Sequence, residues 1–357
     1  MTDADRTFLF DLLSTPSPTG FETPGQKKWA AYVQPFADRV ESDAYGNVWA
    51  TLGGDGPTVL LEAHADEIGF MVKYITDEGF IHVDRIGGSD HAVARGKRVR
   101  ILGSDGPVLG VVGNTAIHLR DRSGEEKAPK LEELFLDIGA SSKDEVAGRG
   151  VRVGHPAVYA DSVEALTEQR LVGRALDNRL GGFVVAQALR QLAASKEKRP
   201  SRVIGLNAVQ EEIGGHGARM AAYRLEPDVA LVLDVTHATD SPGIPKAKHG
   251  EVKLGGGPSI THGTVNHPKV VERLVEIAEQ EDIPLQHEAS SRFSGTDTDV
   301  IFNSKAGVPS ALLSMPLRYM HSTVETVDLG DVEHAVRLMT AFARSVTADD
   351  RFRADIL

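Results

Sequence analysis

Two adjacent glutamates, Glu211 and Glu212, stand where the apolar run 203–209 gives way to glycines. The end of a buried strand is a costly place for two carboxylates unless a cation or a proton compensates for their charge. The pattern suggests a metal centre in which Glu212 binds an ion and Glu211 moves a proton. Such a centre needs further ligands from elsewhere in the chain.

Three other side chains of metal-binding type stand at, or shortly after, the ends of apolar runs: His64, Asp234 and His321. In open α/β sheets, ligands bind beyond the carboxyl ends of the strands. If the strands that carry these residues are parallel, the side chains converge on one crevice. Asp177, at the predicted start of a helix, stands at a favoured capping position and could face the same crevice.

The candidate ligands combine imidazole with carboxylate, which suits Zn²⁺ or Co²⁺ better than Ca²⁺ or Mg²⁺. Five protein ligands are too many for one tetrahedral ion with an open position, but they fit two ions that share a bridging carboxylate. Such ions bring the pKa of a bound water to about 7. Glu211 would take the proton of this water and later deliver it to the leaving nitrogen. Asp66 could accept the second imidazole N–H of His64 and fix its tautomer.

Other interpretations of the same residues stay open at this point. A Glu-Glu pair is often a solvated helix face, and a capping aspartate is often structural. A glycan hydrolase could use two carboxylates without metal, although these should lie about 5–9 Å apart on opposite sides of the bond. Successive side chains on a strand point in opposite directions, which favours separate tasks for Glu211 and Glu212. A two-metal deacylase or carboxypeptidase, or a scaffold with a structural metal, are further alternatives.

The composition narrows the class of protein. The 357-residue chain carries a net charge of −12, which argues against nucleic acid as a partner. It has no cysteine, so a disulfide framework and a thiol nucleophile are excluded. The start of the chain lacks the basic and apolar regions of a signal peptide, and no 18-residue apolar run predicts a membrane span. We therefore expect a cytoplasmic protein without membrane partners.

The apolar patterning predicts an α/β fold in two parts. Near-continuous apolar strands that alternate with helices indicate a sheet covered on both faces, formed by residues 1–66 and 161–357. Short, closely spaced strands over 67–160 predict an inserted antiparallel or barrel-like module. The charged segment 120–130 is expected to be a loop. Helices are expected over 6–14, 26–37, 178–194, 268–281 and 332–343, and strands over 46–51, 58–63, 70–76, 80–86, 97–102, 108–112, 134–139, 202–210, 229–235 and 310–315.

Five motifs in order resemble one known family. They are HADEIG at 64–69, GRALDNR at 173–179, VQEEIG at 209–214, LDVTHATD at 233–240 and RYMHSTVE at 318–325. Together they resemble the tetrahedral (TET) aminopeptidases, di-metal exopeptidases related to glutamyl aminopeptidase. The similarity runs nearly end to end. It implies a Zn-peptidase-like mixed sheet covered by helices, with an inserted β-barrel-like dimerisation domain at 67–160.

The resemblance also implies a role for each matching residue. His64 and Asp234 would hold one ion, Glu212 and His321 the other, and Asp177 would bridge, with Glu211 as general base and Asp66 as support of His64. Two zinc or cobalt ions per subunit, short peptide substrates, and assembly of dimers into a dodecamer are implied as well. We therefore predict a metal-dependent aminopeptidase. Two departures from the family pattern, Asn178 and Gly215-His216, leave the side-chain preference of the enzyme open.

Overall fold

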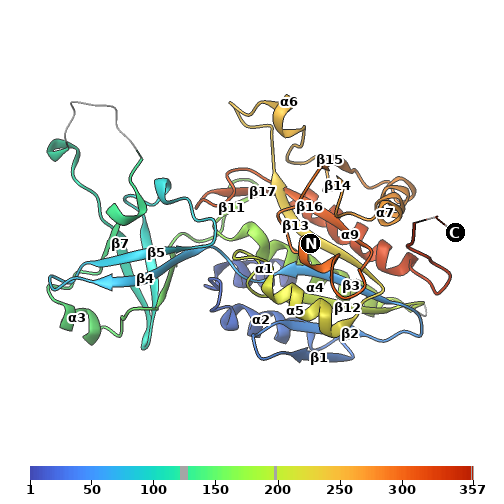
Figure 1. Cartoon of the computed structure of the whole chain (residues 1–357), viewed down its shortest axis with the longest axis horizontal. Coiled ribbons are helices and arrows are strands. Elements are labelled where there is room, and N and C mark those ends of the chain that lie inside the picture. Colours follow the sequence, from blue (N-terminus) through green and yellow to red (C-terminus); the bar gives the residue numbers. More distant parts are fainter. Residues whose placement is uncertain (121–127, 197–198, 355, 357) are drawn as a thin grey trace.

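The computed structural model of the chain describes residues 1–120, 128–196, 199–354 and 356. A layered α/β unit occupies one end of the molecule and a closed β-barrel the other (Figure 1). Most of the predicted loop over 120–130 lies outside the described residues. In the described ranges, no helix combines the length and apolar character that crossing a membrane requires.

A mixed sheet of eight strands forms the centre of the α/β unit, in the order β1-β2-β12-β3-β13-β16-β14-β15. The central strands β12, β3, β13 and β16 are parallel to one another, whereas β2 and β14 flank them in antiparallel orientation. The strands are β1 (Arg39–Ser42), β2 (Val48–Leu52), β3 (Thr58–His64), β12 (Arg202–Ala208), β13 (Val229–His237), β14 (Ser259–Gly263), β15 (Gln286–Ser290) and β16 (Ser310–Leu317).

Helices cover both faces of this sheet, which is why its central strands are apolar along nearly their whole length. Every residue of β3 is buried. Its alternate side chains enter different cores, since Leu61 packs toward one layer of helices and Leu60 toward the other. The predicted fold class is confirmed. The first layer consists of α1 (Asp3–Ser14), α2 (Thr23–Val33), α4 (Leu176–Ala194), α7 (Pro268–Gln280) and α9 (Leu329–Ser345), and the second of α5 (His216–Leu225) and α8 (Thr298–Ile301).

The β-rich segment closes into a barrel in the order β4-β5-β8-β7-β6-β9 and has a hydrophobic core of its own. Along β7, Gly110 and Val112 are buried, while Leu109 and Val111 face outward. Whether the barrel serves in dimerisation stays a prediction. Its elements are β4 (Gly69–Ile75), β5 (Ile81–Ile86), η1 (His91–Val93), β6 (Arg98–Gly103), β7 (Gly106–Val112), η2 (Ile117–Leu119), η3 (Leu131–Glu133), β8 (Phe135–Asp137), α3 (Lys143–Gly148) and β9 (Pro156–Tyr159).

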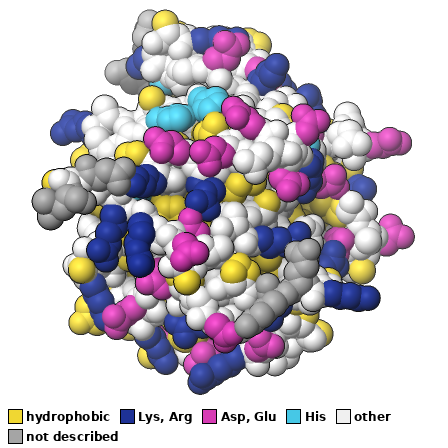
Figure 2. Space-filling model, turned by 90° about the vertical axis from the view of Figure 1, so that its right-hand side faces the viewer, with side chains coloured by type: hydrophobic (Ala, Val, Ile, Leu, Met, Phe, Trp, Pro, Cys, Tyr) yellow, Lys and Arg dark blue, Asp and Glu magenta, His cyan; other side chains and the backbone are white. Residues whose placement is uncertain are grey.

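A small three-stranded sheet, β10-β11-β17, lies at the start of α4 and carries Glu325. It consists of β10 (Glu164–Ala165), β11 (Arg170–Gly173) and β17 (Glu325–Asp328), and the short helix α6 (Lys246–His249) lies in the loop after β13. On the face of the molecule beyond α7 and β15, basic and acidic side chains are interspersed (Figure 2).

Two predicted elements differ from the structure where the candidate site begins. Strand β12 ends at Ala208, two residues before the predicted end, because Gln210 adopts a φ of +60° that cannot continue a strand. Helix α4 has a kink at its start, where Asp177 and Asn178 have non-helical dihedrals, and Oδ1 of Asn178 accepts the N–H of Gly181 at 3.1 Å, as a capping residue does. Asn178, and not Asp177, therefore caps the regular part of the helix, and the carboxylate of Asp177 faces the crevice.

Candidate active site

The carboxyl ends of β3 and β13 bring His64 and Asp234 together. His64 is the last residue of β3, and Asp234 lies near the end of the neighbouring parallel strand β13. Both side chains are buried, and Nε2 of His64 lies 3.6 Å from Oδ1 of Asp234. Parallel pairing thus places an imidazole and a carboxylate at one edge of the sheet, as the sequence predicts.

Asp177 lies between two imidazole rings. Its Oδ1 is 3.2 Å from Nε2 of His64, and its Oδ2 is 3.3 Å from Nε2 of His321. Glu325 holds this part of the chain in place, since its Oε2 accepts hydrogen bonds from the backbone N–H groups of Leu176 and Asp177 at 2.8 and 3.2 Å. The two oxygens of Asp177 therefore face two separate groups of ligands.

Glu211 and Glu212 lie on a turn beyond β12, and Asp66 fixes their backbone. The Asp66 carboxylate is fully buried and accepts the N–H groups of Glu211 and Glu212 at 3.0 and 3.2 Å. The hydroxyl of Thr19 donates a third hydrogen bond at 2.8 Å. Nδ1 of His64 is 3.4 Å from Asp66 Oδ1, so the same carboxylate lies beside the imidazole that it was predicted to support.

His321 reaches the site from the loop between β16 and β17. It adopts a left-handed conformation, with a φ of +63°, and its backbone N–H donates to Oε1 of Glu325 at 2.8 Å. Its Nε2 lies 3.7 Å from Oε2 of Glu212. Its Nδ1 lies 3.1 Å from the backbone carbonyl oxygen of Gly88, which belongs to the barrel. Two distant parts of the chain thus orient this ring.

Six of the seven predicted residues line one crevice, and the seventh, Asp66, is buried directly behind it. The donor atoms that face the crevice fit a metal. His64, Asp177 and Glu212 offer ligand atoms that lie within 4.8 Å of one another. Oε1 of Glu212 is buried and has no hydrogen-bond partner among the described residues, as expected of an atom that a cation would engage. Glu211 lies on the same side, with Oε2 3.9 Å from Nε2 of His64.

The electrostatics of the crevice call for positive charge. Burial raises the pKa of Glu212 well above its usual range and that of Glu211 to about 10, and the neighbouring carboxylates add to both. Burial also raises the pKa of Asp234. Burial alone would raise the pKa of Asp177, but its contacts with His321 and His64 hold it well below the usual range. Divalent cations would stabilise all four carboxylates in their ionised form.

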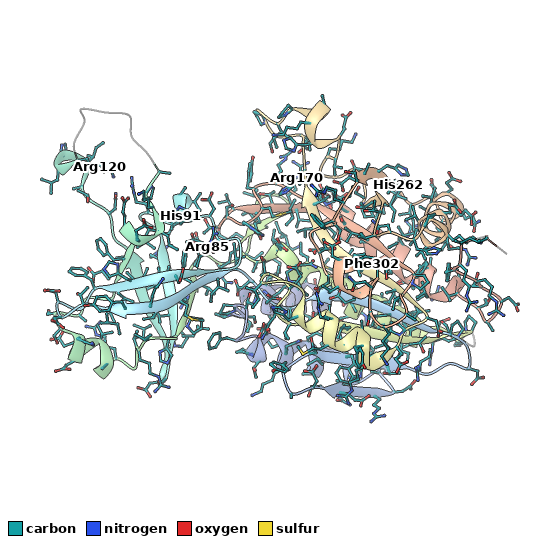
Figure 3. All side chains as sticks on the ribbon, in the orientation of Figure 1. Arg85, His91, Arg120, Arg170, His262 and Phe302 are labelled. Carbon is teal, nitrogen blue, oxygen red and sulfur yellow. The ribbon has the colours of Figure 1, made fainter. Side chains whose placement is uncertain are left out.

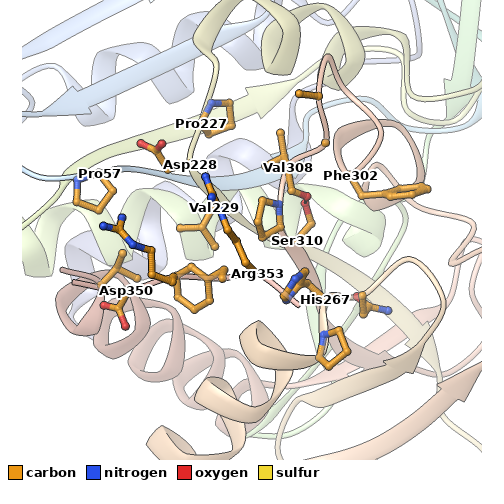
Figure 4. A pocket seen from close by; sticks show the side chains of 18 of the residues that line it. Pro57, Pro227, Asp228, Val229, His267, Phe302, Val308, Ser310, Asp350 and Arg353 are labelled. Carbon is orange, nitrogen blue, oxygen red and sulfur yellow. Dashed lines mark hydrogen bonds between the residues drawn. The ribbon is translucent and has the colours of Figure 1, made fainter. Parts of the chain in front are cut away.

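A cavity of about 770 Å³ opens over these ligands. Thr236, His237, Ser294 and Met320 also line it, and no lysine or arginine does so among the described residues. A second cavity, of about 680 Å³, lies between the C-terminal segment and the amino ends of the strands β3, β13 and β16 (Figure 4). None of the predicted site residues lines that second cavity, so the chemistry belongs to the first.

Sequence reasoning missed two buried acidic side chains near the candidate ligands, Glu325 and Glu62. Glu325 holds the backbones of Asp177 and His321, although it lies within the RYMHSTVE motif. Glu62, two residues before His64, is fully buried beneath the ligands. The available signal was an acidic residue inside an otherwise apolar run, such as Glu62 within 58–63.

The departures from the family pattern have local structural roles. Asn178 donates from its Nδ2 to the carbonyl of Leu233 at 2.7 Å and so ties α4 to the strand that carries Asp234. Gly215 adopts a φ of +67° at the start of α5, and His216 is exposed. Neither departure removes a candidate ligand.

Comparison with known proteins gives the same picture. A family model described as M42 glutamyl aminopeptidase matches residues 46–338. The lysyl aminopeptidase of Pyrococcus furiosus is 34% identical over 343 residues, which is 95% of this chain and 96% of that protein. A TET aminopeptidase from a marine-sediment Thaumarchaeota archaeon is 32% identical, with a TM-score of 0.92 over 97% of both chains. The TET1 peptidase of Pyrococcus horikoshii, which can assemble into a tetrahedron or a large octahedral shell, is 30% identical, with a TM-score of 0.84 over 96% of this chain and all of that one.

Proposed function

The chain belongs to the M42 glutamyl aminopeptidase family, and on this basis we propose how its residues release the N-terminal residue of a short peptide. The chain is a metal-dependent aminopeptidase. In our proposal, His64 and Asp234 hold one ion and Glu212 and His321 the other. Asp177 bridges the pair, because its two oxygens face the two imidazoles.

The ions proposed are zinc or cobalt, which suit a set of imidazole and carboxylate ligands. When bound, they supply Lewis acidity, which polarises the carbonyl of the scissile bond and lowers the pKa of the attacking water. The ligands His64, Asp177 and Asp234 are buried, so bound cations would act on them in a setting of lower dielectric constant than water. The family membership supports metal dependence, and the identity of the ions belongs to the proposal.

Glu211 is the proposed general base. It takes a proton from the attacking water and then donates it to the amine nitrogen that leaves. Burial raises the pKa of Glu211 to about 10 in the metal-free protein. Adjacent cations would lower this pKa toward about 7. A group that both accepts and returns a proton is most effective when its pKa is close to the working pH. Asp66 positions Glu211 by accepting its backbone N–H at 3.0 Å.

This proposal rests on the position of Glu211, whose Oε2 lies 3.9 Å from Nε2 of His64, farther away than Oδ1 of Asp177 at 3.2 Å. A substitution tests it. Glu211→Gln should keep both ions and lower kcat by about 10²–10⁴-fold, the usual contribution of a general acid–base group. Glu226→Gln, which changes an exposed glutamate at the end of α5, is the matched control and should leave kcat unchanged. Near wild-type turnover by Glu211→Gln would show that another group accepts the proton.

The substrate class can be tested separately from the base. An aminopeptidase requires a free N-terminal amine, whereas a two-metal deacylase or carboxypeptidase accepts an N-blocked peptide. Matched peptides with free and acetylated N-termini should therefore differ, with cleavage of the free amine only. A chelator should abolish peptide cleavage, whereas a metal-independent glycan hydrolase would cleave glycans equally well with and without the chelator.

The outer face of the barrel offers a surface for self-association. The TET1 peptidase of Pyrococcus horikoshii forms closed shells, and we propose that this chain forms dimers through its barrel and then a dodecamer. Leu109 and Val111, on the outer face of β7, are 57% and 44% exposed and offer apolar surface for such a contact. Light scattering coupled to gel filtration should give a molecular mass close to that of twelve subunits. A monomeric mass at micromolar concentration would refute the proposed assembly.

A further inference from the structure

A glycine turn in the barrel reaches the metal ligands of the α/β unit. Gly87 and Gly88 directly follow β5, which ends at Ile86, and precede the short helix η1. The residues on either side of this turn, Arg85 and His91, lie at the end of the barrel that faces the large sheet (Figure 3). The turn is thus part of the inserted segment, yet it lies beside residues of the crevice.

The contact with His321 fixes the chemical state of that ring. The carbonyl oxygen of Gly88 lies 3.1 Å from Nδ1 of His321, and a carbonyl can only accept a hydrogen bond. Nδ1 must therefore carry a hydrogen, and in the neutral ring Nε2 then keeps its lone pair, which is directed at the ligand cluster. That Nε2 is 3.3 Å from Asp177 Oδ2 and 3.7 Å from Glu212 Oε2.

The turn leaves no room for side chains. A methyl group on Gly88 would lie 2.6 Å from Nδ1 and 2.7 Å from Cε1 of His321, closer than carbon atoms approach one another. A methyl group on Gly87 would lie 3.1 Å from Cβ and 3.2 Å from Oε2 of Glu212. Gly87 also has a φ of +64°, which disfavours other residues. The two glycines therefore pack directly on the two residues assigned to the same ion.

A second contact joins the barrel to the same loop. Nζ of Lys97, which directly precedes β6, donates to the hydroxyl of Thr323 at 2.6 Å, two residues after His321. For His64 and Asp234, the ligands assigned to the other ion, the hydrogen bonds and ion pairs among the described residues all come from outside the barrel. The barrel thus contacts Glu212 and His321. His64 and Asp234 are held by the strands β3 and β13 instead.

From these contacts we infer that the Gly87–Gly88 turn is a positioning element for Glu212 and His321, so that the barrel completes one of the two metal sites and not the other. The inference rests on the two-ion function proposed above. It gives the inserted segment a role within each subunit, in addition to any role in assembly. It also predicts that damage to the turn affects the two ions unequally.

Zinc binding to Gly88→Ala, measured by calorimetric titration of the chelated protein, tests this inference. One of the two ions should bind about 10–100-fold more weakly than in the wild type, as when the hydrogen-bond partner of a ligand is lost, and the other should bind within about twofold of it. Gly148→Ala is the matched control in the same barrel, since a methyl group there meets no atom within 4 Å. Equal weakening of both ions, or no weakening, would overturn the inference.

Cobalt spectra identify the ion that is affected. The Co²⁺ that remains in Gly88→Ala should have the same visible spectrum as the Co²⁺ that remains in His321→Ala, and a different one from that in His64→Ala. A match to His64→Ala would contradict the assignment. If wild-type protein itself binds a single ion, the proposed function fails instead, so the two failures are distinguishable.

A measurement on the wild-type protein covers the case in which Gly88→Ala does not fold. In Zn²⁺-loaded protein labelled with ¹⁵N in histidine, the side-chain signals of His321, assigned by their loss in His321→Asn, should show a protonated Nδ1. An Nδ1 without hydrogen would mean that Gly88 does not orient the ring, and the inference would be wrong.

Discussion

Without its metal ions, the protein should lose folding stability as the pH rises from about 6 to about 7. Glu62 and Glu325 are fully buried, and burial raises the pKa of each from its ordinary value of 4.5 to about 8. Between pH 6 and pH 7 both groups are protonated in the folded chain and ionised in the unfolded chain. The folded state therefore binds two more protons. The stability that these protons contribute is complete below pH 4.5 and is lost as the pH rises through 8.

The magnitude follows from the number of protons. Each additional proton bound by the folded state changes the free energy of unfolding by about 1.4 kcal/mol per pH unit, so two groups give a loss of about 3 kcal/mol. Glu211, with a pKa raised to about 10, acts in the same direction. A domain has about 5–15 kcal/mol of stability in all, so the effect is large enough to measure.

Urea denaturation at the two pH values, with a chelator and with saturating Zn²⁺, is the assay. The chelated protein should lose about 3 kcal/mol or more on going to the higher pH. The loaded protein should lose much less, because the cations stabilise the ionised carboxylates. Glu62→Gln keeps the shape of the side chain and removes one titrating group, so its loss should be smaller by about 1.4 kcal/mol. If the chelated protein is equally stable at both pH values, or more stable at the higher one, the reasoning from buried protonated carboxyls is refuted.

Two further substitutions test the connections between the ligands. Asp177→Ala should lose both ions together, because one carboxylate faces both imidazoles, and elemental analysis that finds two ions retained would rule out bridging. Glu325→Gln should weaken metal binding about 10–100-fold, since an amide NH₂ replaces one of the oxygens that accept the N–H groups of Asp177 and His321. Unchanged dissociation constants in titrations with Co²⁺ would show that Glu325 has no positioning role.

The fold was predictable because its signals are local in the sequence. The apolar run 58–63 indicates a strand buried on both faces, and β3 has all of its residues buried. The alternation of basic and apolar residues over 98–101 indicates a strand with one face outward, as β6 has. The ends of the strands β3 and β13 also predicted the convergence of His64 and Asp234, because parallel neighbours end at the same edge.

The supporting contacts were not predictable, because they join residues far apart in the chain. Glu325 accepts the N–H of Leu176, 149 residues away, and the carbonyl of Gly88 meets a ring 233 residues away. No periodicity of a sequence encodes such pairs. The local pattern at Asp177 describes only a helix start, whereas its contacts with His64 and His321 are set by the tertiary fold.

The separate tasks proposed for Glu211 and Glu212 rest on a different physical feature from the one the sequence suggested. Strand alternation cannot direct them, because β12 ends at Ala208 and both glutamates lie on the turn beyond it. Their directions are instead fixed at the backbone, where the two oxygens of Asp66 each accept one of their consecutive N–H groups. Since Asp66 also lies beside Nδ1 of His64, one buried carboxylate connects the proposed base and a proposed ligand of each ion. Asp66 therefore helps to set the geometry of the pair, and this geometry would let one glutamate act as the proposed ligand and its neighbour as the proposed base.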